Sequence, residues 1–64
     1  MLRINGEEQD VAGQALADYL SSIGYNAARV VVEINEAIVP RDRYAGTILR
    51  DGDVVEIVCF MGGG

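Results

Sequence analysis

The chain ends in three glycines, Gly62, Gly63 and Gly64, directly after the apolar run 54–61. Glycine has no Cβ and loses the most backbone entropy on ordering, so such a tail can stay flexible and can enter a very narrow channel. The last residue also offers a free carboxylate. A flexible tail without side chains therefore indicates that this carboxylate is the functional group. The alternative is a frayed chain end without a role.

The other residues leave little room for catalysis. The chain has one cysteine and no histidine, so neither a Ser–His nor a Cys–His pair can form. A Cys/His metal cluster and an internal disulfide are excluded for the same reason. Alternation from Asp53 places Cys59 on the core side of the last strand, where we expect it to pack as a small hydrophobic residue. The alternative is that the strand frays before Cys59 and leaves it partly exposed. The sequence predicts a carrier or substrate protein, not an enzyme, without a cofactor or metal of its own.

Composition narrows the class of partner. The formal net charge is -5, and all five cations are arginine. A nucleic-acid-binding protein needs a basic surface, so the charge disfavours nucleic acid and fits a partner with a basic groove. No segment approaches the length of a membrane span, and no signal-peptide pattern is present, so we expect a cytoplasmic protein.

The 64 residues predict one domain, residues 1–61, followed by the flexible glycine tail, residues 62–64. The first half reads as a strand over 1–5, an Asn5-Gly6 hairpin turn and a polar return strand over 7–11. A helical stripe then begins at Gln14, with Gly13 as the candidate N-cap, and ends before Gly24. Its expected core residues are Leu16, Tyr19, Leu20 and Ile23.

The second half of the sequence predicts three further strands, the last of which leads to the C-terminal glycines. They cover 29–35, 37–39 and 53–61, with turns at 35–36 and 51–52 and a loop or short helical turn over 40–46. A right-handed connection would place the last strand parallel to the first. The expected fold is therefore α+β, a β-grasp or ubiquitin-like fold with a mixed sheet of roughly four to five strands and one main helix on one face.

Three segments carry a resemblance to a known family: residues 34–41, residues 51–58 and the terminal 62–64. Together they resemble the ThiS sulfur carriers of thiamine thiazole synthesis, over essentially the whole chain. The small subunit of molybdopterin synthase looks similar at its tail but is usually longer.

The resemblance implies a carrier cycle centred on Gly64. A ubiquitin-activating-type adenylating enzyme would use MgATP to convert the carboxylate to an acyl-adenylate. A persulfide sulfur would then displace AMP and leave a C-terminal thiocarboxylate, and thiazole synthase would receive that sulfur. Gly62 and Gly63 would form the tether, which reaches at most about 10 Å when the three glycines are extended.

The outward face of the last strand is the candidate docking surface. Alternation places Val54, Glu56, Val58 and Phe60 there, and three apolar residues on an exposed face suggest a partner for Val58 and Phe60. Burial by the crossover segment or by self-association is the alternative. Arg41 and Arg43 could pair with a partner or could belong to a solvated loop.

Three other functions stay open. The chain could carry sulfur in another route, such as molybdopterin synthesis. It could be a ubiquitin-like modifier attached to target lysines. It could also be a β-grasp interaction module whose tail has no chemical role.

Overall fold

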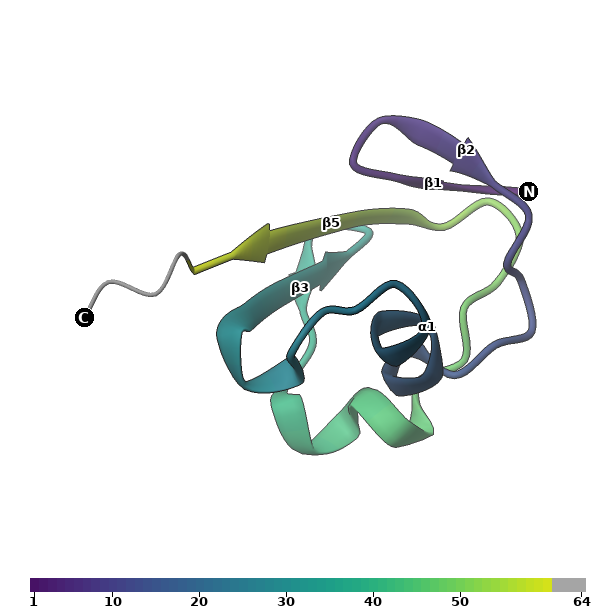
Figure 1. The fold of residues 1–64 in the computed structure, drawn as a ribbon. Coiled ribbons are helices and arrows are strands. Elements are labelled where there is room, and N and C mark those ends of the chain that lie inside the picture. The colour runs from purple at the N-terminus through teal and green to yellow at the C-terminus, as the bar shows by residue number, and fades with distance from the viewer. Residues whose placement is uncertain (61–64) are drawn as a thin grey trace.

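The computed structural model describes residues 1–60. In chain order the elements are β1 (Leu2–Ile4), β2 (Glu7–Gln9), α1 (Leu16–Ser22), η1 (Ala27–Arg29), β3 (Val30–Ile34), β4 (Ala37–Ile38), η2 (Arg41–Gly46) and β5 (Val54–Cys59). The strands form one sheet in the order β2-β1-β5-β3-β4. β1 pairs antiparallel with β2 but parallel with β5, which lies in the middle of the sheet (Figure 1). The predicted β-grasp architecture is confirmed.

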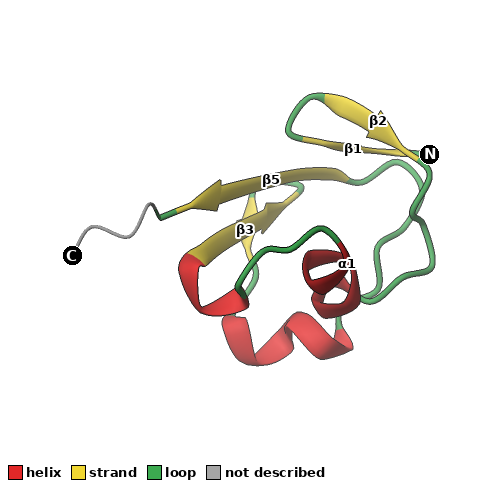
Figure 2. Ribbon diagram, viewed as in Figure 1, coloured by secondary structure: helices red, strands yellow, loops and turns green. Residues whose placement is uncertain are grey.

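The helical elements lie together on one side of the sheet (Figure 2). α1 buries Leu16, Tyr19 and Leu20 against the strands, as its apolar stripe predicts. The buried hydrophobic core comprises Leu2, Ile4, Leu16, Tyr19, Leu20, Val30, Val32, Tyr44, Leu49, Val55 and Ile57. The opposite face of the sheet carries no helix among the described elements, so it remains open to solvent.

Two hairpins use turn residues in the left-handed region. Asn5 and Gly6 have φ values of 51° and 84°, and Asn35 and Glu36 have 51° and 70°. Positive φ at both central residues is the requirement of the type I′ turn, whose twist matches the flanking strands. Asn and Gly adopt these angles at low cost, whereas Glu36 is an uncommon residue for this region. The predicted turns at both asparagines are confirmed.

The two asparagine side chains also fasten β5. The Asn5 amide donates to the Ile57 carbonyl at 3.2 Å and accepts from the Ile57 N–H at 2.8 Å. Because β1 ends at Ile4, these bonds extend its ladder along β5. On the other side, the Asn35 side-chain oxygen accepts from the Val54 N–H at 3.0 Å. β5 is therefore restrained from both neighbouring strands.

The main helix begins two residues later than predicted, at Leu16. Residue Ala15, not Gly13, is the N-cap, and its extended angles (φ -69°, ψ 142°) follow from a bridge to Ile48. The Leu16 N–H donates to the Thr47 carbonyl at 2.7 Å, which satisfies a donor that the helix itself leaves unpaired. Tertiary pairing therefore fixes the start of this helix, and a local sequence pattern does not reveal it.

Other boundaries also differ from the prediction. Helix α1 ends at Ser22, and Ile23, expected in the core, is 43% exposed. The helix stop at Gly24, with φ of +84°, is confirmed. The short helix η1 was not predicted; the Asn26 side chain caps it by accepting from the Ala28 N–H at 2.9 Å.

Candidate functional site

The candidate site begins with the alternation along β5. Val55 and Ile57 are buried toward α1, whereas Val54, Glu56 and Val58 are exposed on the open face, as predicted. Phe60 follows the strand, and its N–H donates to the Arg29 carbonyl at 2.8 Å. This bond continues the pairing of the chain with the β3 side up to the last described residue.

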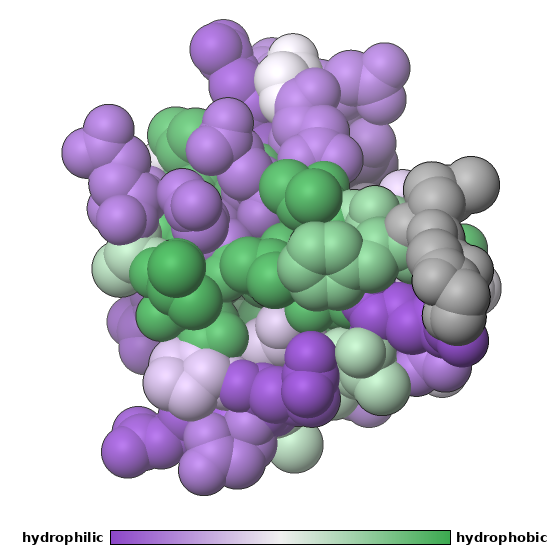
Figure 3. Space-filling model, turned by 90° about the vertical axis from the view of Figure 1, so that its left-hand side faces the viewer, coloured by the Kyte–Doolittle hydropathy of each residue, from purple (hydrophilic) through white to green (hydrophobic). Residues whose placement is uncertain are grey.

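The open face carries an apolar band. We give this name to the exposed side chains Ile38, Val54, Val58 and Phe60. Val58 is 57% exposed and Phe60 56% exposed, and Val58 lies opposite the half-buried Val31 of β3. Figure 3 shows hydrophobic side chains gathered across the middle of one face, with hydrophilic ones above and below. A gathering of exposed apolar side chains on one face is typical of a protein interaction surface.

Two carboxylates interrupt the band. Glu33 of β3 lies directly opposite Glu56 of β5, and Ile38 of β4 lies opposite Glu33 on its other side. Like charges directly opposite one another destabilise a sheet. Within residues 1–60, the one ion pair joins the Met1 amine to Asp51 at 2.7 Å, so neither glutamate is neutralised by an arginine there. The face therefore presents apolar side chains around a local negative charge.

The expected packing of Cys59 in the core is wrong, and the exposed alternative is the one observed. Its register opposite the buried Val30 places it on the helix side, as expected, but the thiol is exposed. The helical layer does not reach it, because α1 ends at Ser22 and the nearby Tyr25 is itself 37% exposed. The charge of Cys59, and next a hydrogen bond with it, raises the pKa of Tyr25 above its ordinary value.

The chemical end of the site lies beyond the described residues. Gly62, Gly63 and Gly64 belong to the segment after residue 60, so their predicted roles stay predictions. The structure describes what precedes them, a central strand that carries Val58 on its open face and is followed by the exposed Phe60.

Arg41 has a structural role within the chain. Its guanidinium donates to the carbonyls of Ala27 at 3.0 Å and Ala28 at 3.3 Å, and so ties η2 to η1. Arg43 lines a surface groove instead. Through residue 60 the chain has no group of three or more side chains that could hold a metal ion. None of the helices in that part is both long and apolar enough to cross a membrane.

Sequence reasoning missed two parts of this site. Ile38 joins the apolar band only because β4 lies at the sheet edge beside β3, and that cross-strand neighbour is not visible in a local pattern. The Asn5 amide was assigned to a turn, but its bonds to Ile57 also hold the strand that carries the band.

Comparison with known proteins gives consistent matches. The ThiS family model matches residues 2–64. The sulfur carrier protein ThiS of Thermus thermophilus is 38% identical over 64 residues, covering all of both chains. A crystal structure of a thiamine biosynthesis protein (ThiS) from Geobacter metallireducens has a TM-score of 0.75 and 36% identity, covering 98% of this chain and 97% of that one.

A longer relative also aligns. A thiazole synthase of Paramagnetospirillum magneticum is 44% identical over 64 residues, which cover 98% of this chain but 20% of that protein. The chain thus spans about a fifth of the length of that relative. Since the family model and the full-length relatives agree along nearly all its residues, the chain belongs to the ThiS family.

Proposed function

We propose that this chain is a sulfur carrier for thiamine biosynthesis whose Gly64 carboxylate is the sulfur acceptor. The observation that carries the proposal is a central strand, β5, that ends in exposed apolar side chains a few residues before the three glycines in the sequence. Relatives of the same length are named sulfur carriers, which supports the same role here. The chain acts as a co-substrate of other enzymes and contributes no catalytic group of its own.

The chemistry requires activation by a partner. With a pKa of about 3.5, the terminal carboxylate is ionised and a poor electrophile at neutral pH. A ubiquitin-activating-type enzyme uses MgATP: a carboxylate oxygen of Gly64 attacks the α-phosphorus, and pyrophosphate leaves. The terminal sulfur of a protein persulfide then attacks the carbonyl carbon, and AMP leaves. A thiol cleaves the resulting acyl disulfide and releases the thiocarboxylate.

Thiazole synthase is the proposed recipient of this sulfur. The support is the pair of longer relatives named thiazole synthase, each of which contains a segment that matches this chain along 98% of its length. A carrier and an acceptor enzyme joined in one polypeptide act at high effective concentration, which suits two proteins that must meet repeatedly.

Intact-mass measurement tests the carrier function directly. The chain is co-expressed with an adenylating enzyme and a persulfide donor, and the expected result is a fraction in which one oxygen is replaced by sulfur. A Gly63→Val variant should remain unloaded, because a narrow channel cannot accept a β-branched side chain and small displacements are costly in positioning-driven reactions. Equal loading of both proteins would contradict a functional role of the glycines.

Phe60 provides the test of docking. Phe60→Asp should weaken binding to the adenylating enzyme by at least about tenfold, since buried aromatic side chains often dominate interface energies. Thermal stability should change little, because Phe60 is 56% exposed. Ile23→Asp is the matched control, because Ile23 is a 43% exposed apolar residue outside the band. Equal effects of the two substitutions would remove Phe60 from the interface.

A further inference from the structure

A groove lies at one edge of the sheet, beside β4. Its volume is about 380 Å³, and its apolar floor includes Ile34, Ile38 and Ile48. Ile38 and Ile48 are both exposed. β4 is the last strand in the sheet order, so its outer side has no strand partner among residues 1–60. The groove therefore borders backbone groups that another extended segment could pair with.

The free charge of this groove is positive. Arg43 and Arg50 line it, and neither takes part in an ion pair with another residue that the structure describes. Asp53 also lines the groove, but its carboxylate is already engaged. One oxygen accepts from the Asn35 amide at 3.1 Å and the other from the Arg50 backbone N–H at 3.0 Å. An occupant that pairs with β4 here would therefore be extended and acidic.

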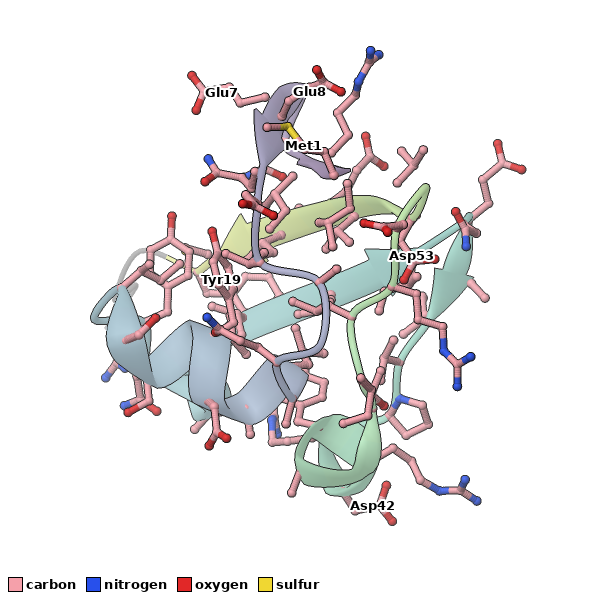
Figure 4. All side chains as sticks on the ribbon, turned by 90° about the vertical axis from the view of Figure 1, so that its right-hand side faces the viewer. Met1, Glu7, Glu8, Tyr19, Asp42 and Asp53 are labelled. Carbon is pink, nitrogen blue, oxygen red and sulfur yellow. The ribbon has the colours of Figure 1, made fainter. Side chains whose placement is uncertain are left out.

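The opposite edge of the sheet has the complementary character. β2 is the other terminal strand, and Glu7, Glu8 and the following Asp10 make this edge acidic. Figure 4 shows Glu7 and Glu8 projecting from the hairpin, away from Asp53 beside the groove. Glu7 pairs with the buried Ile4, so its side chain lies on the helix side of the sheet, the side on which η2 contributes Arg43 to the groove.

We propose that two copies of this chain associate head to tail, with the acidic β2 edge of one copy seated on the β4 groove of the next. The carboxylates of Glu7 and Asp10 face Arg43 and Arg50, and main-chain pairing extends the sheet across the contact. Such a contact uses two different surfaces and is heterologous, so it can repeat. Because the net charge of each copy is -5, long-range repulsion opposes association and keeps it weak.

This association leaves the carrier surface available. β5 is not an edge strand, and Val58 and Phe60 do not line the groove. Ile38 is the one residue that belongs to both the band and the groove. Head-to-tail association and docking through Val58 and Phe60 therefore use largely different surfaces. Loss of self-association need not remove docking to a partner enzyme, so the two interactions can be tested separately.

The test is a dilution series of the full chain followed by amide NMR shifts. Shifts should change with concentration at Glu7 on β2 and Ile38 on β4. Arg43→Glu/Arg50→Glu and Glu7→Arg/Asp10→Arg should each weaken self-association by at least about tenfold, since like charges then oppose one another. Glu8 is left unchanged because it lies opposite Arg3.

Mixing the two charge-reversed variants gives the decisive result. One has an acidic groove and the other a basic edge, so they should bind each other and restore the shift changes. Arg29→Glu and Asp18→Arg, exposed sites away from both edges, serve as matched controls and should behave as the unmodified chain. If a double variant does not give a folded amide spectrum, Arg50→Glu and Glu7→Arg alone replace the pair.

Three results would overturn the proposal. The first is the absence of concentration-dependent shifts. The second is a set of shifts centred on Val58 and Phe60, which would mean association through the apolar band. The third is a chain that stays monomeric while the Arg43→Glu/Arg50→Glu variant binds the adenylating enzyme more weakly. That result would make the partner enzyme the occupant of the groove.

Discussion

Replacement of Asn5 tests how the chain holds its central strand. The Asn5 amide makes two partly buried hydrogen bonds to the backbone of Ile57 on β5. Asn5→Gly removes both bonds but keeps the left-handed backbone, since glycine adopts the observed φ of 51° without strain. Asn5→Ala removes the same bonds and adds the cost of that conformation for a residue with a Cβ.

The expected losses follow from the two contacts. A buried hydrogen bond contributes about 1 kcal/mol net, so Asn5→Gly should lower the free energy of unfolding by about 2 kcal/mol. Asn5→Ala should lower it by about 3 kcal/mol, because left-handed backbone costs alanine about 1 kcal/mol more. A domain of 64 residues has a total stability of roughly 3–10 kcal/mol, so either loss is a large fraction.

Urea unfolding gives the free energies, and amide hydrogen exchange gives the location. The Ile57 N–H is bonded to the Asn5 side chain, so its protection should fall in both variants more than that of the Asn5 N–H, which donates to the Val55 carbonyl. An Asn5→Gly protein within about 0.5 kcal/mol of the unmodified chain, with Ile57 still protected, would refute this account of β5.

Three further predictions concern single surface groups. Glu36→Gly should raise the free energy of unfolding by about 0.5–1 kcal/mol in urea titrations, because glycine relieves the φ of 70° in the turn; a lower stability would contradict this. Cys59→Ser should change stability by less than about 0.5 kcal/mol and leave sulfur loading intact, while a spectroscopic titration should show a lower pKa for Tyr25. The pKa of the Met1 amine is raised above 8.0, first by its hydrogen bond to Asp51. The contribution of the protonated amine to folding stability is therefore fully present below the ordinary pKa of the amine. This stability is lost as the pH rises through the raised pKa. Urea midpoints should show this alkaline loss in the unmodified chain, and Asp51→Asn should reduce it.

Much of this fold could be predicted from short-range patterns. The two turns at Asn5 and Asn35 and the helix stop at Gly24 require positive φ. Asparagine and glycine are the residue types that favour this conformation, so the local sequence predicts all three. The stripe of α1 and the alternation of β5 likewise express burial through spacing. These features require only neighbours within a few positions.

The errors arise where distant segments decide the outcome. Helix α1 starts at Leu16 because the preceding Ala15 pairs with Ile48, far along the chain. Cys59 is exposed because the helical layer ends before it, although strict alternation assigns it to the core. Alternation predicts which side a residue faces, but the length of the covering element decides whether that side is buried.

The position of β5 in the sheet suits the carrier function proposed above. β5 is paired with β1 on one side and β3 on the other, and two asparagine amides add bonds where those ladders end. A sheet edge would be a less suitable origin for the C-terminal segment, because edge strands have one partner and open more easily. Central pairing lets Val58 and Phe60 keep a fixed position while both remain exposed. Under the proposed function, a partner that recognises this surface would bind a few residues before the glycines in the sequence, and docking would then bring the Gly64 carboxylate toward the partner's active site.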